Sequence, residues 1–452
     1  MKKILRFSFA IVLFLFAVTG CKNDSVKEVK LNSNKSDTKK IIKLKWLGQW
    51  YGEGKKETFV RELAREFSFQ NQNIQVELEF PHQMAKTDVN GAFAATIDTI
   101  TNMVLQNKWP YDFMLCDSYI YNGVSSRVKN PNWGDEYLVN FIDKKWFLEG
   151  HKENLFKSRQ YTDIFSGIAP GAYIEGVWNL LYVSSEVENK LGIKVKLHDM
   201  NMSDFSSYAK AVFQYNQSHK EKITFFTSPV IPSTTFFNQL IMSAFNKDTI
   251  YTKEKAINAL KQVYDVVDEL VKYKPMEKYF TYKDSKALYQ DKGLFVYCAS
   301  WIYLIWQHSN PEGVKVMHPC EIPSIDNKQA NTYSGVYSSI FVIPKNAKNK
   351  EAAELLMKFI CSQETAEKWT KYAKSPTGLS NRISYSDFGK DEFAKFDQHI
   401  KKKYNDKLGD ADQIAIIFNS KAPLNYQFET VLYGATSAKN AFDALLKQVN
   451  AK

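Results

Sequence analysis

The order of predicted strands and helices downstream of position 40 constrains the fold most. Residues 43–47 and 74–80 have the pattern of strands, and residues 57–69 between them place apolar side chains on one face of a helix. A second helix is predicted over 93–105 and a third strand over 111–116. This strand–helix–strand order favours an α/β layer with a parallel sheet, in which ligands bind at the carboxyl ends of the strands.

The pattern restarts near Gly167, which predicts a second sheet domain. We expect further strands over 177–183, 293–298, 314–317 and 340–343, and helices over 203–215, 235–245, 258–271, 351–372 and 438–449. The chain has 452 residues, and the length of its part from 41 to 452 predicts about two to three domains.

The N-terminal segment has the pattern of a secretory signal. A short basic start precedes an apolar run of about a dozen residues, which is too short for a stable membrane span. The residues Val18-Thr19-Gly20-Cys21 resemble a bacterial lipoprotein box, in which Cys21 becomes the lipidated first residue. We therefore expect a signal peptide over 1–20 and a lipidated flexible tether over 21–40, which lacks aromatic residues. The alternative is an ordinary signal peptide with an incidental cysteine. Both place the mature protein outside the cytoplasmic membrane.

The net charge of +11 does not indicate a nucleic-acid partner. Part of this charge lies in the signal and the tether, and the remaining lysines are scattered among Asp and Glu. Nucleic-acid binding needs a concentrated basic stripe. The one dense run, 401–403, is flanked by Asp397 and Asp406, so we expect a solvated face and no nucleic-acid partner.

No motif predicts catalysis, a metal site or a cofactor. The seven His residues are dispersed, and Gly-x-Ser-x-Gly and His-Glu-x-x-His are absent. The cysteines after Cys21 match no metal spacing and are expected to be buried free thiols, with a Cys298–Cys320 disulfide left open. We expect a protein that is not an enzyme and that needs no metal or cofactor. A surface glycan hydrolase stays an alternative, because glycosidase carboxylates leave little trace in a sequence.

Aromatic residues gather beside turns at the ends of the predicted strands. They are Trp50, Tyr51, Tyr119, Tyr121, Tyr173, Trp178, Trp301, Tyr333 and Tyr337. Flat aromatic faces pack against the CH-rich faces of sugar rings, while amides and carboxylates beside them bind hydroxyl groups. The pattern favours a carbohydrate site, and the alternative for each single ring is core packing.

Six segments follow one another in the order of a known family. They are Pro110-Tyr-Asp-Phe-Met-Leu-Cys-Asp117, Gly167-Ile-Ala-Pro170 with Asn179-Leu-Leu-Tyr-Val183, Leu191-Gly-Ile193 with Met202-Ser-Asp-Phe205, Gly293 to Trp301, Phe341-Val-Ile-Pro-Lys-Asn346 with Asn349-Lys-Glu-Ala-Ala353, and Pro376-Thr-Gly378. From Lys43 to its end the chain thereby resembles the extracellular solute-binding proteins of ABC importers, in the carbohydrate-binding group related to maltodextrin-binding proteins. It departs from the family at Val183, where the family often has Asn.

The resemblance implies an α/β, two-lobed, periplasmic-binding-protein-like (type II) fold with a cleft between the lobes, which close around a ligand. Lobe 1 is expected to hold 41–168 and 340–378, and lobe 2 to hold 169–339 and 379–452. The implied partners are a carbohydrate, the permease subunits of an ABC transporter and, through the lipid, a membrane. We expect a monomer.

The resemblance and the strand ends together predict ten ligand-binding residues. Trp301 is the expected stacking platform, and Asp117 is the expected acceptor for sugar hydroxyls. The others are Ser300, Gln49, Trp50, Glu175, Trp178, Tyr333, Gly335 and Tyr337.

Several alternatives stay open at this point. The same fold also serves sensors that present a ligand to a signalling receptor without transport. Within the binding class, the ligand could be a polyol or a sugar phosphate. The identity and length of the sugar and the choice between inner and outer membrane are not encoded in these patterns.

Overall fold

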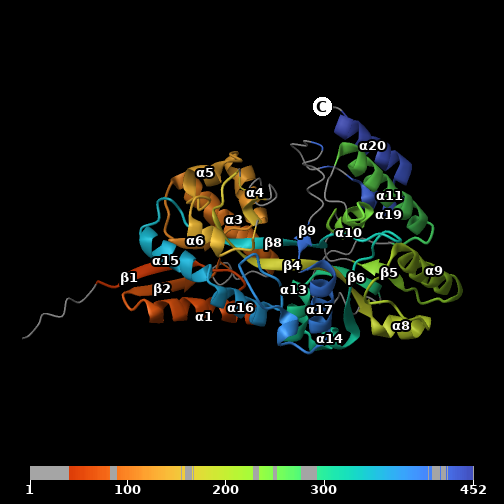
Figure 1. Ribbon diagram of the computed structural model, residues 1–452, viewed down its shortest axis with the longest axis horizontal. Coiled ribbons are helices and arrows are strands. Elements are labelled where there is room, and N and C mark those ends of the chain that lie inside the picture. Colours follow the sequence, from red (N-terminus) through yellow and green to blue (C-terminus); the bar gives the residue numbers. More distant parts are fainter. Residues whose placement is uncertain are drawn as a thin grey trace, which may run out of the picture. The chain divides into compact units, whose positions relative to one another are not determined.

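A mixed sheet runs through the folded part of the chain (Figure 1). The computed structural model describes residues 40–81, 89–153, 155–157, 165, 167–227, 234–247, 252–275, 293–405, 407–409, 418, 424 and 426–450. Within these residues the strands follow the order β2-β1-β3-β8-β4-β6-β5, with β7 on β4 and β9 on β8. Residues 41–452 form one unit. The predicted signal peptide, most of the tether and Cys21 lie outside the described residues.

The first part of the sheet agrees with the strand–helix–strand prediction. Strand β1 (Ile42–Leu47) pairs in parallel with β2 (Ile74–Glu79) and β3 (Phe113–Leu115). Helices α1 (Lys55–Gln70) and α3 (Val89–Gln106) follow β1 and β2 in the chain. The elements lie where they were expected, because the local apolar period determines their type and approximate place. Their bounds differ from the expected ones by a few residues at most positions.

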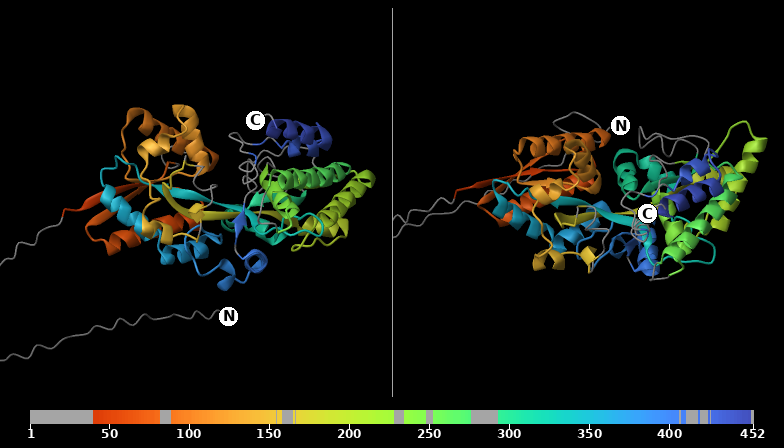
Figure 2. Two further views of the ribbon diagram at one scale, coloured as in Figure 1. Left: turned by 45° about the horizontal axis from the view of Figure 1, so that its top comes forward. Right: turned by 90° about the horizontal axis from the view of Figure 1, so that it is seen from above.

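Helices cover both faces of this part of the sheet (Figure 1, Figure 2). Helix α3 and the following α4 (Ser118–Val128) and α5 (Trp133–Tyr137) lie on one side, and α1 and α16 (Gln363–Ala373) lie on the other. The buried side of α1 consists of the residues that its sequence pattern places on one stripe. They are Phe59, Val60, Leu63, Ala64 and Phe67, together with Lys56.

Two long antiparallel strands connect the first part of the sheet with the second. Strand β4 (Gly171–Ser184) pairs with β8 (Tyr333–Val342) from Gly171–Val342 to Trp178–Gly335. Strand β8 also pairs with β3, and the later residues of β4 pair with β6 (Gly293–Ala299). Both strands are longer than predicted. They are buried almost throughout, so their sequences lack the alternation that marks a half-exposed strand.

The second part of the sheet is likewise packed against helices. Strand β5 (Thr224–Thr227) is parallel to β6, and β7 (Met317–Cys320) pairs with β4. The helices of this part are α8 (Ser185–Leu191), α9 (Met202–Ser218), α10 (Thr234–Ala244), α11 (Lys253–Val271), α13 (Trp301–Ser309), α14 (Pro311–Val316), α17 (Glu392–Tyr404), α19 (Phe428–Leu432) and α20 (Ala438–Asn450). The short elements of the structure include α6 (Lys145–Glu149), β9 (Leu408–Gly409) and the 3₁₀ helices η1 (Leu155–Lys157) and η2 (Tyr385–Asp387).

Two predicted elements are wrong in type or number. Residues 314–316 belong to the end of α14, which begins at Pro311, and the strand starts only at Met317. Proline at the first helical position is pre-organised for a helix, and this signal outweighs the short apolar run. The single helix expected over 351–372 is two, α15 (Lys350–Ile360) and α16. Ser362 separates them because its hydroxyl accepts from the backbone N–H of Thr365 and caps α16.

Buried apolar side chains form separate clusters on the two parts of the sheet. The first cluster draws on residues 44–174 and 337–379, together with Leu304. The second draws on 181–449 and packs β4–β7 against α9, α10, α11 and α20. A third, smaller cluster includes residues of α13 and α17 beside β4 and β8. The predicted lobe boundaries stay a prediction, because clusters show where side chains pack and not where the chain divides.

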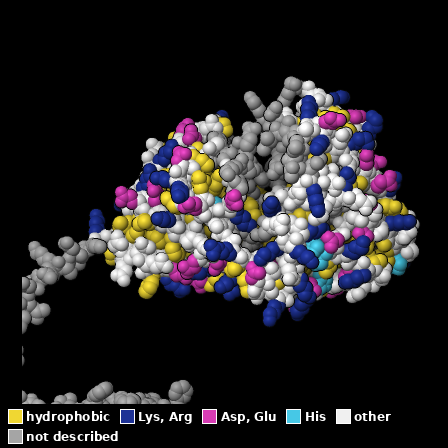
Figure 3. Space-filling view, in the orientation of Figure 1, with side chains coloured by type: hydrophobic (Ala, Val, Ile, Leu, Met, Phe, Trp, Pro, Cys, Tyr) yellow, Lys and Arg dark blue, Asp and Glu magenta, His cyan; other side chains and the backbone are white. Residues whose placement is uncertain are grey.

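The surface carries both signs of charge. On the face seen in Figure 3, Lys and Arg side chains are interspersed with Asp and Glu. Among the helices that the structure describes, none has the length and apolar character needed to cross a bilayer.

Candidate functional site

A buried ion cluster connects the loop after β1 with the long strand β4. The ammonium of Lys56, at the start of α1, lies 2.5 Å from Glu175 Oε1 and 3.4 Å from Glu53 Oε2. The hydroxyl of Ser339 in β8 donates to Glu175 Oε2 at 2.6 Å. The side chains of Lys56, Glu53 and Glu175 are only 4%, 10% and 8% exposed. A buried ion pair is retained only when both charges are well partnered, so this cluster is a strong local constraint.

Two residues beside the cluster have strained backbones. Trp50 has φ 68° and Ser339 has φ 46°, although neither is glycine. Left-handed backbone costs bulky residues free energy and persists only where the surroundings enforce it, most often at functional sites. Their common location beside Lys56 and Glu175 therefore points to this region as a site.

The electrostatics of the cluster favour the protonated form of Lys56. Burial lowers the pKa of Lys56, but the charges of Glu175 and Glu53 raise it more, so the ammonium stays protonated. Burial raises the pKa of Glu53, and the charge of Glu175 adds to that rise while Lys56 opposes it. One ammonium thus lies between two buried carboxyl groups.

Asp117 follows β3, as predicted, and lies within the field of this cluster. Its carboxylate caps α4, accepting from the backbone N–H of Ile120 at 2.7 Å. Burial raises the pKa of Asp117 to about 6, with the charge of Glu175 contributing to the rise and the amide of Ile120 opposing it. Asp117 is 9% exposed.

Gln49 is a buried amide without partners in the described part of the chain. It is 1% exposed, and neither its Oε1 nor its Nε2 has a hydrogen bond there. Leaving a buried polar group unsatisfied costs about 1–3 kcal/mol, so such a group calls for a functional explanation. Gln49 follows β1 and Asp117 follows β3, and these two strands are parallel neighbours. The carboxyl ends of both strands therefore meet at one edge of the sheet, as the sequence predicted.

Trp50 is buried, and its predicted contact with a ligand stays a prediction. It is 3% exposed, and its ring packs against Trp369 and Phe341, with centroids 5.2 Å and 6.0 Å away. The Lys56 ammonium lies 5.7 Å from the ring centroid, a distance typical of a cation–π contact. The placement supports a role for Trp50 in fixing Lys56 and the adjacent Gln49.

Ser300 and Trp301 lie where β6 passes into α13. The Ser300 hydroxyl accepts from the backbone N–H of Trp178 at 3.3 Å and is 3.3 Å from Ser375 Oγ. Ser300 is thereby buried between chain segments. Trp301, the first residue of α13, is partly exposed. Its role as a stacking platform stays a prediction.

Trp178 and Tyr333 are core residues in this structure. The Trp178 ring is 1% exposed and packs against Phe393 and Phe396 of α17. Tyr333 is fully buried, and its hydroxyl accepts from the backbone N–H of Ile322 at 3.3 Å. Helix α17 covers these rings, and their role in ligand binding stays a prediction.

Gly335 and Tyr337 have local structural reasons for their identities. A Cβ atom on Gly335 would lie 2.4 Å from the carbonyl oxygen of Val177, so the pairing of β4 with β8 requires glycine. Tyr337 is 5% exposed, and its hydroxyl accepts from Lys152 Nζ at 3.0 Å. Neither observation tests contact with a ligand.

The structure thus brings together Gln49, Trp50, Glu175 and the nearby Asp117. Sequence reasoning missed Lys56, Glu53 and Ser339, which complete the cluster. A usable signal was present in Glu53 and Lys56, which are three positions apart at the start of a helix that follows a strand. That signal does not reveal burial, which depends on β4.

The four described cysteines after Cys21 are buried free thiols, as expected. The Cys298–Cys320 disulfide that the sequence left open is absent. Cys298 pairs with Leu180 of β4, and Cys320 pairs with Leu181. Strand β4 therefore lies between the two cysteines, and two strand spacings of about 4.8 Å exceed the reach of a disulfide.

Comparisons with known proteins identify the fold. No protein-family model matches the sequence, and a comparison with curated proteins finds no match. Among solved structures, the apo form of RafE from Streptococcus pneumoniae matches with a TM-score of 0.59 and 13% identity, over 90% of this chain and 98% of that one. A solute-binding protein of an ABC transporter from Thermotoga lettingae TMO, bound with α-D-tagatose, matches with a TM-score of 0.58 and 16% identity, over 91% and 99%.

A third match is the ABC substrate-binding protein Lmo0181 from Listeria monocytogenes in complex with cycloalternan, with a TM-score of 0.56 and 14% identity, over 91% of this chain and 98% of that one. The chain therefore has the two-lobed, type II periplasmic-binding-protein-like fold of ABC solute-binding proteins, which confirms the predicted fold class. At these identities the likeness defines the fold and not the ligand.

Proposed function

We propose that this protein is the binding component of an ABC importer, and that it captures a sugar or an oligosaccharide outside the cytoplasmic membrane. The observation that carries the proposal is Gln49, a buried amide without partners at the edge where β1 and β3 end. The fold supports it. Two of the three matched structures are binding proteins of ABC transporters in complex with α-D-tagatose and with cycloalternan, and the third is the apo form of RafE.

The chemistry of the site suits hydroxyl-rich, uncharged ligands. An amide such as Gln49 both donates and accepts, as a sugar hydroxyl does, and a carboxylate such as Asp117 accepts strongly from hydroxyl groups. The partly exposed Trp301 would supply a flat face for a sugar ring. A sugar phosphate is disfavoured, because Lys56 is already neutralised by Glu53 and Glu175.

Delivery to a membrane permease is part of the same proposal. Lipidation at Cys21 would anchor the protein, and the tether over 21–40 would let the folded part reach its partner. The two lobes would close around the ligand by bending at β4 and β8, the long strands that connect the two parts of the sheet. The protein then acts as a receptor and not as a catalyst.

Calorimetry against a panel of mono- and oligosaccharides tests this function. We expect at least one sugar to bind, and Trp301→Ala to lower its affinity because a stacking face is lost, by about 1–3 kcal/mol as for aromatic stacking in other sites. Trp146→Ala, a half-buried tryptophan on α6, serves as the control. Unchanged affinity in Trp301→Ala would remove this residue from the site, and a panel without any binder would contradict the proposed function.

Ligand binding is expected to depend on pH through Asp117. The pKa of Asp117 is about 6 in the folded protein and 3.8 as the reference value. Its carboxylate, the form that accepts from hydroxyls, is therefore present above pH 6 and is lost as the pH falls through about 6. We expect affinity to fall over this window.

The raised pKa also gives the sign of the effect on stability. Because the folded state binds the proton more tightly than the unfolded state, the contribution of Asp117 to stability increases as the pH falls from 6 toward 4. In Asp117→Asn, both the stability change and the loss of affinity over this window should disappear. A wild-type pH profile identical to that of the variant would contradict the assignment.

A further inference from the structure

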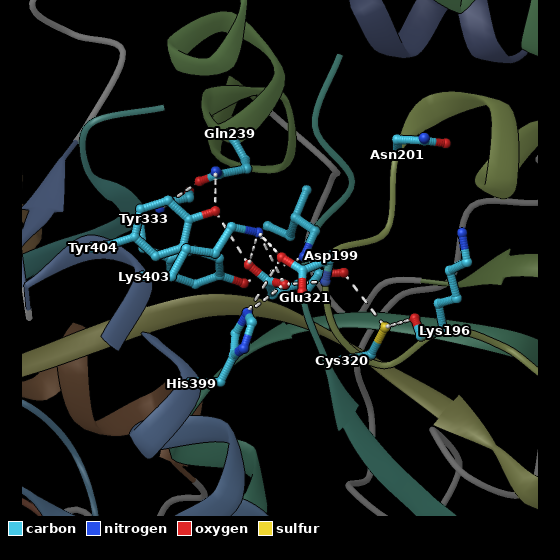
Figure 4. Close-up of polar contacts among 12 residues, drawn as sticks. Lys196, Asp199, Asn201, Gln239, Cys320, Glu321, Tyr333, His399, Lys403 and Tyr404 are labelled. Carbon is cyan, nitrogen blue, oxygen red and sulfur yellow. Dashed lines mark hydrogen bonds and ion pairs between the residues drawn. The ribbon is translucent and has the colours of Figure 1, made fainter. Parts of the chain in front are cut away.

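A second polar cluster lies in the other part of the protein, and the proposed function does not use it. It joins His198 in the loop between α8 and α9, Glu321 directly after β7, and His399 on α17. Figure 4 shows Glu321 and His399 with the polar groups around them. One ligand atom from each of these residues lies within 4.8 Å of the others. Among the described residues, no other group of three or more His, Cys, Asp or Glu side chains has this arrangement.

The donor atoms of this cluster are close and include one without a partner. His399 Nε2 lies 2.9 Å from Glu321 Oε2. The rings of His198 and His399 stack with centroids 4.4 Å apart. Nδ1 of His198 is buried and has no hydrogen bond within the described part of the chain. An imidazole nitrogen that is buried without a partner is poorly satisfied by protein alone, and it is a common ligand for transition metals.

Surrounding groups hold the carboxylate in place. Glu321 is 1% exposed, the hydroxyl of Tyr404 donates to its Oε1 at 3.1 Å, and the backbone N–H of Asp199 donates to its Oε2 at 2.5 Å. Outer partners of this kind orient the ligands of metal sites. The carboxylate of Asp199 lies 3.9 Å from His399 Nε2, so a second carboxylate lies close enough to serve as a ligand.

Lys403 supplies the positive charge beside the carboxylates of Glu321 and Asp199. Its ammonium lies 3.1 Å from Glu321 Oε1 and 2.7 Å from Asp199 Oδ1. Lys403 and Asp199 also line a cavity of about 410 Å³ that includes Asn201 and Lys247. The flexible lysine stem can therefore swing into this cavity when another cation takes the place of the ammonium.

We propose that His198, Glu321 and His399 bind a zinc ion, with Asp199 as the fourth ligand. Two imidazoles with carboxylates are a donor set that suits zinc, and in a tetrahedral site with bonds of about 2.1 Å the ligand atoms lie about 3.4 Å apart. The distances of 2.9 Å and 3.9 Å to His399 Nε2 bracket this value. The ligand atoms of His198, Glu321 and His399 lie within 4.8 Å of one another, so zinc binding requires side-chain shifts of about 1 Å.

Zinc would bind residues from segments that are distant in the chain. Asp199 and Glu321 are 122 positions apart, and Glu321 and His399 are 78 apart. A ligand that binds only the folded state stabilises it in proportion to the logarithm of its concentration above Kd. Zinc is therefore expected to raise the Tm.

The test uses the full mature chain, stripped of metal by a chelator and titrated with ZnCl₂. Calorimetry should give about one zinc per chain, and thermal unfolding should show a rise in Tm that MgCl₂ and CaCl₂ do not produce, because these ions prefer all-oxygen sites. His399→Ala should lower zinc affinity at least tenfold. His198→Phe, which keeps a ring for stacking but removes the nitrogen, should do the same and guards against misfolding of the first variant.

Two further variants make the result decisive. His318 pairs with the carboxylate of Glu392 on the same helix as His399, and His318→Ala should leave zinc affinity unchanged. Lys403→Met should bind zinc more tightly than wild type, because the competing ammonium is gone. A wild-type protein without a zinc-dependent Tm shift, equal losses in His318→Ala and His399→Ala, or weaker binding in Lys403→Met would each overturn the proposal and leave an ion-pair network only.

Discussion

Replacing Lys56 with methionine is expected to lower the free energy of unfolding by about 3–5 kcal/mol, the cost of breaking a buried ion pair. The substitution leaves the carboxylates of Glu53 and Glu175 buried without the ammonium that lies 3.4 Å and 2.5 Å from them. Chemical denaturation followed by tryptophan fluorescence measures the difference between variant and wild type.

An exposed ion pair provides the matched control for this variant. Lys261 and Asp265 on α11 lie 2.7 Å apart, with side chains 59% and 60% exposed. Lys261→Met should therefore change the free energy of unfolding by less than about 1 kcal/mol. Adding Glu175→Gln to Lys56→Met should regain part of the loss, since one uncompensated charge is removed. Equal effects of Lys56→Met and Lys261→Met would show that water solvates the cluster.

Replacing Gln49 with leucine is expected to separate binding from stability. The affinity for the best sugar of the panel should fall about tenfold or more, because a buried hydrogen bond to a ligand contributes about 1–2 kcal/mol. The free energy of unfolding should stay the same or rise, since the amide has no partner in the described part of the chain. Calorimetry and denaturation of the same preparations measure both quantities.

Gln262→Leu is the control for this second prediction. Gln262 is half-buried on α11, where its Nε2 donates to the carbonyl of Asn258, and its substitution should affect neither quantity strongly. Gln49→Leu that lowers stability but leaves affinity unchanged would show that the amide serves the fold. That result would remove the observation on which the proposed function depends.

Local patterns predicted the elements that pack with one face. Helix α1 buries the stripe that begins at Phe59, and β1 and β2 lie within a residue or two of the predicted bounds. The prediction was less accurate where burial is complete. The strands β4 and β8 are buried on both faces, and their sequences therefore carry no period that marks their ends.

The residues of the candidate site show the same difference between what local sequence patterns predict and what tertiary packing decides. Gln49 and Asp117 were predicted correctly to lie at one sheet edge, because each directly follows a strand and the two strands are parallel. Trp178 and Tyr333 also lie in strands, but α17 covers them. Nothing near Trp178 in the sequence indicates that residues more than 200 positions later pack on it.

By itself, the sequence determined the α/β class, the alternation of elements and the residues at the strand ends, since these depend on neighbours within one or two turns of chain. The tertiary structure alone decided that Lys56 is buried against Glu175, 119 positions away, and that His198, Glu321 and His399 meet. Burial and charge pairing are properties of three-dimensional proximity, and the dielectric surroundings that give these groups their energies exist only after the chain has folded.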